Sequence, residues 1–418
     1  NNLSSNITRP LAKIFLEAFE SSRVVTKTVN TQLLSGKFNP STGTKVDFKR
    51  PHDYNTIRSA GGDISAAAKS DIIAGKATGT VQEYFTAATE WSNIQEALEL
   101  DQLDQILEPM ARRLVTDLEL DLAKFMRINT GLNYGARGTA VDAWSDVAGA
   151  GAMMDSVGVP MSDNKYYLMN PFTTTSLASA QSGLNAADGL VRTAFEKAQI
   201  ASNFGGMKAL TSNALSSYTS GSTTDRLGDL KTAPDATYVT AKDTMQQTMV
   251  IETLGTGTIE AGDQIQVAGV NRLNIATRQL ILDTTGAAVP WTGTVLSVVT
   301  IAGNEATVVV SGAAIYEANG QYNNVDAAPA AGAVVTILGA AATVYQPNLF
   351  YTEQAFGLGT VKLPKLYSTD TVATTSDGMS IRVSKYSDGD ANTQKIRFDL
   401  LPAYAVFQPN FAGQGYGV

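Results

Sequence analysis

Apolar residues near the start of the chain recur at intervals of three and four. They fall at Leu11, Ile14, Phe15, Ala18 and Phe19. Because an α-helix turns once in about 3.6 residues, this spacing places them on one helical face. The pattern therefore predicts a helix over residues 11–20.

The same spacing continues for much longer over residues 92–127. The apolar stripe consists of Leu103, Leu107, Met110, Leu114, Leu118, Leu122 and Phe125. At 1.5 Å per residue such a helix extends over roughly 50 Å, which is typical of a structural spine. Ser92 is the predicted N-cap. Pro109 predicts a kink or a break into two helices, because proline removes a backbone donor.

Strict alternation of apolar and polar residues marks later parts of the chain. Ile265 and Val267 alternate with polar neighbours, and residues 294–312 predict a hairpin that turns at Gly303 and Asn304. Strands this short and evenly spaced, between about residues 224 and 345, indicate a small β-barrel or sandwich. The segment resembles an insertion, because mixed α/β patterns precede and follow it.

Residues 36–85 are rich in turn formers and poor in core material. Val46 and Phe48 alternate with Lys45, Asp47 and Lys49, which predicts a two-stranded excursion with a basic rim. Long segments of this kind in a compact protein commonly bind something outside their own domain.

Charge is unevenly distributed along the chain. Residues 1–60 hold nine Lys/Arg and four Asp/Glu, so their net charge is 9 − 4 = +5, and the remainder carries −8 − 5 = −13. An acidic body is poorly suited to general nucleic-acid binding. A basic segment suits an acidic neighbour, such as another copy of the chain, although a solvated arm fits the charge equally well.

Catalytic and metal-binding patterns are weak or missing in the sequence. There is no cysteine, and no phosphate-binding loop or nucleophile elbow occurs. His52 is the only histidine, and it is expected to be a solvent-facing loop residue. Asp388, Asp390 and Asn392 imitate the start of a calcium loop, but a hairpin turn is the better interpretation. The carboxylates Asp117, Glu119 and Asp121 do not share one helical face. The residues therefore favour a self-associating structural protein without a cofactor or metal, and not an enzyme.

The segment NLFYTEQAFGLGTVKLP at 348–364 resembles a C-terminal signature of tailed-bacteriophage major capsid proteins. The matching positions are Asn348, Leu349, Phe350, Ala355, Phe356, Leu358, Thr360, Leu363 and Pro364, with Pro402, Phe407 and Pro409 in the ending. A strand, a short turn and a last strand follow, as in that family. The insertion resembles that of coat proteins from short-tailed enterobacterial phages.

This resemblance implies an α+β capsid fold of the Hong Kong phage type with an inserted small β-barrel. The implied parts are an N-terminal arm (1–35), an extended loop (36–85), a spine helix in the peripheral domain (86–130), a first axial part (131–225), the inserted barrel (226–345), and a second axial and peripheral part with the closing sheet (346–418). Residues 348–364 then resume the axial domain after the insertion.

The resemblance also implies a function and partners. Family members assemble as hexamers and pentamers into an icosahedral shell around double-stranded DNA, through a scaffolded precursor that expands. A scaffolding protein, a portal protein and copies of the chain itself are the implied partners, and assembly in the cytoplasm of a host bacterium is the implied setting.

Specific residues follow from these implications. Lys45, Lys49 and Arg50 are the expected contacts of the extended loop with a neighbouring subunit. The candidate hinges for expansion are Gly61, Gly62, Gly75, Gly79 and Pro109, although ordinary turns explain the glycines equally well. Two other functions are open at this point: a carbohydrate-binding phage tail or surface protein, and the shell of a cellular nanocompartment.

Overall fold

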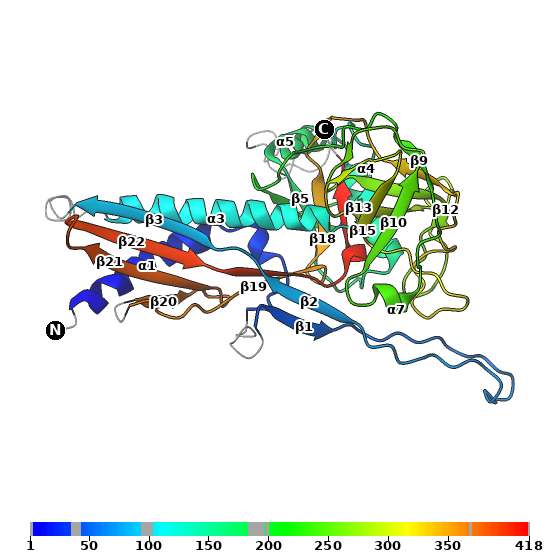
Figure 1. The fold of residues 1–418 in the computed structure, drawn as a ribbon, viewed down its shortest axis with the longest axis horizontal. Coiled ribbons are helices and arrows are strands. Elements are labelled where there is room, and N and C mark those ends of the chain that lie inside the picture. Colours follow the sequence, from blue (N-terminus) through cyan, green and yellow to red (C-terminus); the bar gives the residue numbers. More distant parts are fainter. Residues whose placement is uncertain are drawn as a thin grey trace. The chain divides into compact units, whose positions relative to one another are not determined.

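The computed structural model describes residues 3–34, 43–92, 103–182, 197, 200–367 and 370–416. The chain divides into two compact units. The first unit comprises Asn1–Asp47, Thr78–Lys124 and Phe356–Ala405, and the second comprises Phe48–Ala77, Phe125–Ala355 and Val406–Val418. Figure 1 labels many of the helices and strands of both.

Helices α1 and α3 bury the faces that their sequences predict. Helix α1 spans Leu3–Ser22, the 3-10 turn η1 spans Val25–Lys27, and α3 spans Leu103–Ile128. Phe15 and Phe19 of α1 are buried, and Phe15 stacks on Phe398 with ring centroids 3.9 Å apart. The helix predicted over residues 11–20 is therefore confirmed.

Helix α3 carries the predicted apolar stripe. Its buried leucines are Leu107, Leu114, Leu118 and Leu122. Pro109 lies inside the helix, so the predicted break into two helices does not occur there. Residues 93–102 and the side chain of Leu103 fall outside the described part of the chain.

The assignment of residues 86–92 to the spine helix segment is wrong. Residues 86–92 belong instead to strand β3 (Phe85–Ser92), in which Ser92 pairs with Thr393. The capping role expected of Ser92 depends on residues outside the described part of the chain. The sequence FTAATEWS contains β-branched and aromatic residues that favour a strand. Pairing of all eight residues with a neighbouring strand fixes that choice.

Strand β3 forms the edge of a four-stranded antiparallel sheet, in the order β20-β21-β22-β3. The other strands are β20 (Thr371–Thr374), β21 (Ser380–Asp388) and β22 (Thr393–Leu400). Ile396, Phe398 and Leu400 are all buried, as their alternation predicts. The turn at 389–392 is the expected hairpin, with Asn392 in a left-handed conformation at φ 50°.

A second four-stranded sheet has the order β1-β2-β23-β19. Its strands are β1 (Lys45–Lys49), β2 (Lys76–Val81), β23 (Pro402–Val406) and β19 (Phe356–Thr360). Neighbours β1 and β2 form the two-stranded base predicted for the extended loop. The residues of the loop lie between these two strands.

The second unit contains a six-stranded mixed sheet, in the order β4-β24-β18-β5-β7-β6. Its strands are β4 (Leu132–Tyr134), β24 (Ala412–Gly415), β18 (Asn348–Thr352), β5 (Lys165–Met169), β7 (Met207–Thr211) and β6 (Asn203–Phe204). Helices α4 (Trp144–Val157) and α5 (Pro171–Ser182) belong to the same unit, and the 3-10 turn η3 spans Pro409–Phe411. All five residues of β18 are buried, which explains its nearly continuous apolar sequence.

A closed six-stranded barrel interrupts this sheet in the sequence, with strand order β10-β15-β13-β12-β16-β9. The strands are β9 (Leu227–Leu230), β10 (Gln246–Glu252), β12 (Gln264–Asn271), β13 (Pro290–Val295), β15 (Ala306–Ser311) and β16 (Val334–Ile337). Smaller elements accompany it: α7 (Tyr238–Ala241), the pair β11 (Thr258–Ile259) with β14 (Val299–Thr300), and the pair β8 (Tyr218–Thr219) with β17 (Val344–Tyr345). The predicted small barrel is confirmed.

The turn predicted at Gly303 and Asn304 is also present. Both residues have positive φ angles, 61° and 64°, as a type I′ turn requires. Ala302 and Glu305 bridge its two sides through reciprocal backbone hydrogen bonds of 3.0 and 3.1 Å. Short-range sequence chemistry was therefore sufficient to find this turn.

Candidate assembly surfaces

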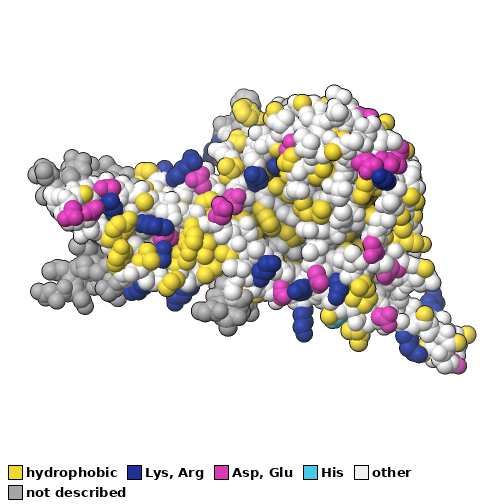
Figure 2. Space-filling model, viewed as in Figure 1, with side chains coloured by type: hydrophobic (Ala, Val, Ile, Leu, Met, Phe, Trp, Pro, Cys, Tyr) yellow, Lys and Arg dark blue, Asp and Glu magenta, His cyan; other side chains and the backbone are white. Residues whose placement is uncertain are grey.

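The outer part of the extended loop, residues 50–76, exposes apolar side chains that the rest of its unit does not cover. Tyr54 is 54% exposed, Ile72 is 76% exposed, and Ile57 and Ile64 are also exposed. Figure 2 shows yellow hydrophobic side chains at the surface of this projecting loop. An exposed group of apolar side chains on an extended segment marks a surface suited to another molecule.

The three cations predicted on the loop rim do not share one environment. Lys45 and Lys49 are exposed on β1 and make no ion pair with any residue that the structure describes. Arg50 is buried, and its guanidinium donates to the carbonyls of Lys76 and Phe407 within the same chain. Burial lowers the pKa of Arg50. Arg50 therefore anchors the base of the loop, and only the two lysines remain available to a neighbour.

The basic N-terminal segment is similarly engaged by its own chain. Arg23 is buried and its guanidinium forms an ion pair with Asp377. Lys27 donates to the carbonyl of Glu20 at 2.7 Å, and Lys13 lies 3.8 Å from Glu17. Part of the +5 charge seen in the sequence is thus neutralised inside the unit.

The candidate hinge residues divide into two kinds. Gly61 and Gly62 lie in open space, and Gly62 has a φ of +74° that favours glycine. A Cβ on Gly75 would lie 2.8 Å from the carbonyl oxygen of Lys242, and one on Gly79 would lie 2.6 Å from Leu33. Close packing therefore explains Gly75 and Gly79 without a hinge. Pro109 lies within helix α3.

A shallow groove of about 420 Å³ runs between strand β3 and helix α3. Phe85, Ala88, Met110 and Leu114 line it. At its rim, Arg113 and Asp117 form an ion pair at 3.0 Å on the exposed face of α3. The groove is open and partly apolar.

The three carboxylates considered for catalysis are not brought together. Asp117 pairs with Arg113, and Asp121 accepts a hydrogen bond of 2.9 Å from the Tyr404 hydroxyl. Glu119 is buried and accepts hydrogen bonds from the amides of Val24 and Thr26. Burial raises the pKa of Glu119 against the effect of those hydrogen bonds. Each carboxylate has a separate structural partner.

Other chemistry is equally limited in the described residues. His52 is exposed on the loop, as predicted. Within the described ranges, no three His, Asp or Glu side chains come together as a metal site. None of the described helices has both the length and the apolar character that a bilayer span requires.

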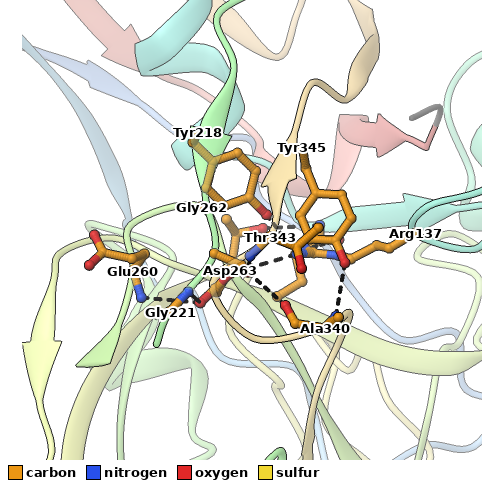
Figure 3. A network of polar contacts seen from close by, with 12 residues as sticks. Arg137, Tyr218, Gly221, Glu260, Gly262, Asp263, Ala340, Thr343 and Tyr345 are labelled. Carbon is orange, nitrogen blue, oxygen red and sulfur yellow. Dashed lines mark hydrogen bonds and ion pairs between the residues drawn. The ribbon is translucent and has the colours of Figure 1, made fainter. Parts of the chain in front are cut away.

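A buried polar network joins the barrel to the six-stranded sheet of the second unit, and Figure 3 shows its centre. Asp263 is fully buried and accepts hydrogen bonds from the amides of Gly221 and Glu260, at 2.9 and 3.1 Å. The Arg137 guanidinium lies 3.7 Å from Asp263 and donates to the Tyr218 hydroxyl at 2.6 Å. Burial raises the pKa of Tyr218, so its hydroxyl stays neutral.

Sequence reasoning missed this network completely. Its members come from positions as distant as Arg137, Tyr218, Asp263 and Tyr345, and none of them belongs to a recognisable motif. Arg226 also lies 3.9 Å from Asp263. Only a fold that closes the barrel next to the sheet can place two guanidinium groups around one carboxylate.

Comparison with known proteins gives full-length matches. The family model described as P22 coat protein, gene protein 5, matches residues 1–417. A major capsid protein from Acyrthosiphon pisum secondary endosymbiont phage 1 is 47% identical over 422 residues, covering 100% of this chain and 99% of that protein.

Solved structures match at lower identity. The capsid of Cyanophage P-SCSP1u is 13% identical, with a TM-score of 0.44, and the match covers 94% of this chain and 86% of that one. A structure from Mycobacterium phage Che8 is 11% identical, with a TM-score of 0.46, and the match covers 92% and 88%.

Proposed function

The chain belongs to the P22 coat protein family, and from that membership we propose that it assembles as hexamers and pentamers into a closed icosahedral shell. As a phage major capsid protein it is a structural component of the particle. The shell in this proposal encloses double-stranded DNA without reading its sequence. A scaffolding protein and a portal protein take part in assembly, which proceeds in the cytoplasm of the host bacterium.

The exposed apolar side chains of the extended loop are the observation that supports this proposal most directly. A closed shell needs every copy to carry surfaces complementary to its neighbours. The loop exposes Ile57, Ile64 and Ile72, which lose contact with water only if another molecule covers them. Individually weak contacts are sufficient, because each copy in a shell engages several neighbours.

We propose the same location for the basic contact. Lys45 and Lys49 at the base of the loop meet acidic groups of a neighbouring copy, whereas Arg50 serves its own fold. Gly61 and Gly62 remain the better candidate hinges for an expansion of the shell, and Pro109 remains a candidate. Catalysis plays no part in this function.

We also propose that residues 226–345 form a domain inserted between two axial parts, 131–225 and 346–418. All six barrel strands lie between Leu227 and Ile337, and β18 then enters the middle of the six-stranded sheet. The arm (1–35), extended loop (36–85) and spine segment (86–130) complete the proposed organisation, with the strand β3 at the start of the last.

Light scattering with negative-stain imaging of the purified protein, with and without scaffold, tests the function. Closed shells of megadalton mass are expected. A 44.1 kDa monomer that stays small under both conditions contradicts the proposal. In that event carbohydrate binding by the barrel becomes the better hypothesis, although neither it nor a nanocompartment shell finds support in the comparisons.

Loop variants locate the contact. Ile64→Asp places a charge in the apolar surface and is expected to reduce shell yield at least about tenfold, and Ser59→Asp is the matched control on the same loop. Lys45→Glu with Lys49→Glu is expected to weaken assembly, and Lys45→Gln with Lys49→Gln to weaken it less. Unchanged shell yield in the Glu pair removes the two lysines from the interface.

A further inference from the structure

Both limbs of the extended loop are held by residues that belong to the inserted segment, within the second unit. The first limb is residues 50–55 and the second is residues 70–76. Segments 238–243 and 317–323, together with Arg278, contact them. We call these contacts the loop-root clamp.

On the first limb, Asp53 and Asn55 are the held residues. Arg278 forms an ion pair with Asp53, and the amide of Asp53 donates to the Tyr322 hydroxyl at 3.4 Å. The side-chain amide of Asn55 donates to the carbonyl of Asn319 at 2.7 Å.

The Arg278 side chain is held in place by backbone carbonyls of the inserted segment. Its guanidinium donates to the carbonyls of Ile275, Gln321 and Asn323, the last at 3.1 Å. Because three backbone carbonyls orient the side chain, little further conformational freedom is lost when it binds Asp53. The ion pair thus joins the loop to a rigid part of the inserted segment.

On the second limb, the contacts are made mostly to the loop backbone. Gln321 is buried and its side-chain amide donates to the carbonyl of Asp71 at 2.6 Å. The Asp243 carboxylate accepts a hydrogen bond of 3.2 Å from the amide of Lys76. Side chains of the inserted segment therefore position the loop through hydrogen bonds to its backbone.

Aromatic packing closes the clamp between the limbs. Tyr238 and Tyr322 stack with ring centroids 3.6 Å apart and planes 11° from parallel. Ile73 of the second limb packs against the small apolar cluster that contains Tyr238. Gly75 allows the backbone to approach, since a Cβ there would lie 3.0 Å from the Tyr238 hydroxyl.

Beyond residues 55 and 70 the loop is almost fully exposed to solvent. The amide of Asn55 donates to the Ser70 hydroxyl at 2.9 Å, and this bond joins the two limbs. From Thr56 to Lys69 every residue is exposed except Ala67, which is half-buried. An open cavity of about 850 Å³ lies between the loop and the 317–323 segment, and residues of both limbs line it together with Thr56, Ile57, Ala68 and Lys69.

We propose that the inserted segment sets the direction in which the extended loop leaves its own chain, through the loop-root clamp. The insertion then influences assembly from inside one subunit, by presenting the loop to the next copy in a fixed orientation. Its consequence for assembly rests on the proposed function, whereas the clamp itself exists in the single chain.

Hydrogen exchange on the unassembled full-length chain tests the clamp directly. The reporters are the amides of Arg50, Asp53, Asn55 and Lys76, which all have defined acceptors. Gln321→Ala and Asp53→Asn are each expected to speed exchange at these amides at least about threefold. Lys231→Ala is the matched control, because it removes an exposed ion pair with Glu305 elsewhere on the same segment.

Two outcomes separate the possible explanations. If both Gln321→Ala and Asp53→Asn show the same exchange rates at the reporter amides as the Lys231→Ala control, the clamp is overturned. If Gln321→Ala also accelerates exchange in strand β10, the barrel itself has been damaged. Asp53→Asn then decides, because it changes only the loop side of the ion pair.

Shell diameter provides the second readout. With wild-type shells of one size, Asp53→Asn is expected to broaden the diameter distribution, and the Lys231→Ala control to leave it unchanged. An unchanged distribution together with faster exchange confines the clamp to the single chain and overturns its role in assembly. If the wild-type chain forms no shells, the proposed function fails while the exchange result still stands.

Discussion

The barrel of the second unit and the β20-β21-β22-β3 sheet of the first unit are both antiparallel, yet they are stabilised differently. The barrel encloses an apolar core that includes Met249, Ile251 and Val308, all buried. Its buried charges, Asp263 and Arg272, contact segments outside the barrel strands, although Arg272 also donates to the carbonyl of Thr292 in β13. The barrel interior is therefore mainly apolar.

The sheet has an apolar face and a charged one. Phe398 stacks on Phe15 of α1, while the next residue, Asp399, is fully buried and paired. Arg382 binds Asp399 at 2.6 Å, and Thr86 of β3 donates to the same carboxylate at 2.7 Å. One carboxylate thus connects three adjacent strands. Closure into a barrel makes such a connection unnecessary, because no edge strand remains.

The largest expected effect tests this difference in the sheet. Asp399→Ala leaves the buried Arg382 without its carboxylate partner, and breaking a buried pair typically costs about 3–5 kcal/mol. Urea unfolding followed by hydrogen exchange in β21 and β22 measures the loss. Asp390→Ala, at an exposed turn position, is expected to stay within about 0.5 kcal/mol. Similar losses in both variants would contradict a special role for Asp399.

Ile251→Ala makes the corresponding change in the barrel. Removal of a fully buried isoleucine typically costs about 2–5 kcal/mol through lost burial and a cavity. The loss should appear as faster exchange in β10 and β15 and should leave the sheet unaffected. Val250→Ala, an outward-facing neighbour that is only half-buried, is the control and should cost less.

Acid should separate the two regions. Burial alone would raise the pKa of Asp399, but hydrogen bonds from Arg382, Thr86 and Arg397 outweigh it and hold the pKa below its ordinary value. The stability that this group contributes is therefore present above the ordinary aspartate pKa of about 3.9 and is lost as pH falls through the lower folded value. Protection factors of β21 and β22 should fall in that window, and those of the barrel core should change less. Equal losses would contradict the comparison.

The contribution of Glu119 to the stability of the first unit should change with pH in the opposite direction from that of Asp399, and at higher pH. Burial raises its pKa, so its contribution is fully present below the ordinary glutamate pKa of about 4.3 and is lost as pH rises through the folded value. The variant Glu119→Gln should remove this decline from the first unit. A decline that persists in the variant would assign it to another group.

The smallest effect concerns the two hairpin turns. Gly303 in the barrel has a φ of +61°, whereas Gly389 in the sheet is not in the left-handed region, and both lie in open space. Gly303→Ala is expected to cost about 1–2 kcal/mol, because a Cβ is strained in a left-handed conformation. Gly389→Ala should be nearly neutral. Thermal unfolding of both variants checks the contrast.

Local patterns in the sequence determined much of this fold. The α1 and α3 stripes, the alternation in the barrel strands and the Gly303–Asn304 turn each depend on neighbours within a few residues. The exposure of His52 and of the extended loop followed from the same kind of information. In these places the periodicity of apolar residues is sufficient to predict the element, because a single buried face determines where those residues fall.

Only the tertiary structure decided the remaining features. Ser92 became a strand residue because β22 pairs with it, and Arg50 became an internal anchor because the carbonyl of Phe407 lies within its reach. Asp399, Asp263 and the loop-root clamp join residues that are far apart in the chain. Burial of a charge is favourable only when partners surround it, and a single sequence does not show which distant groups will become those partners.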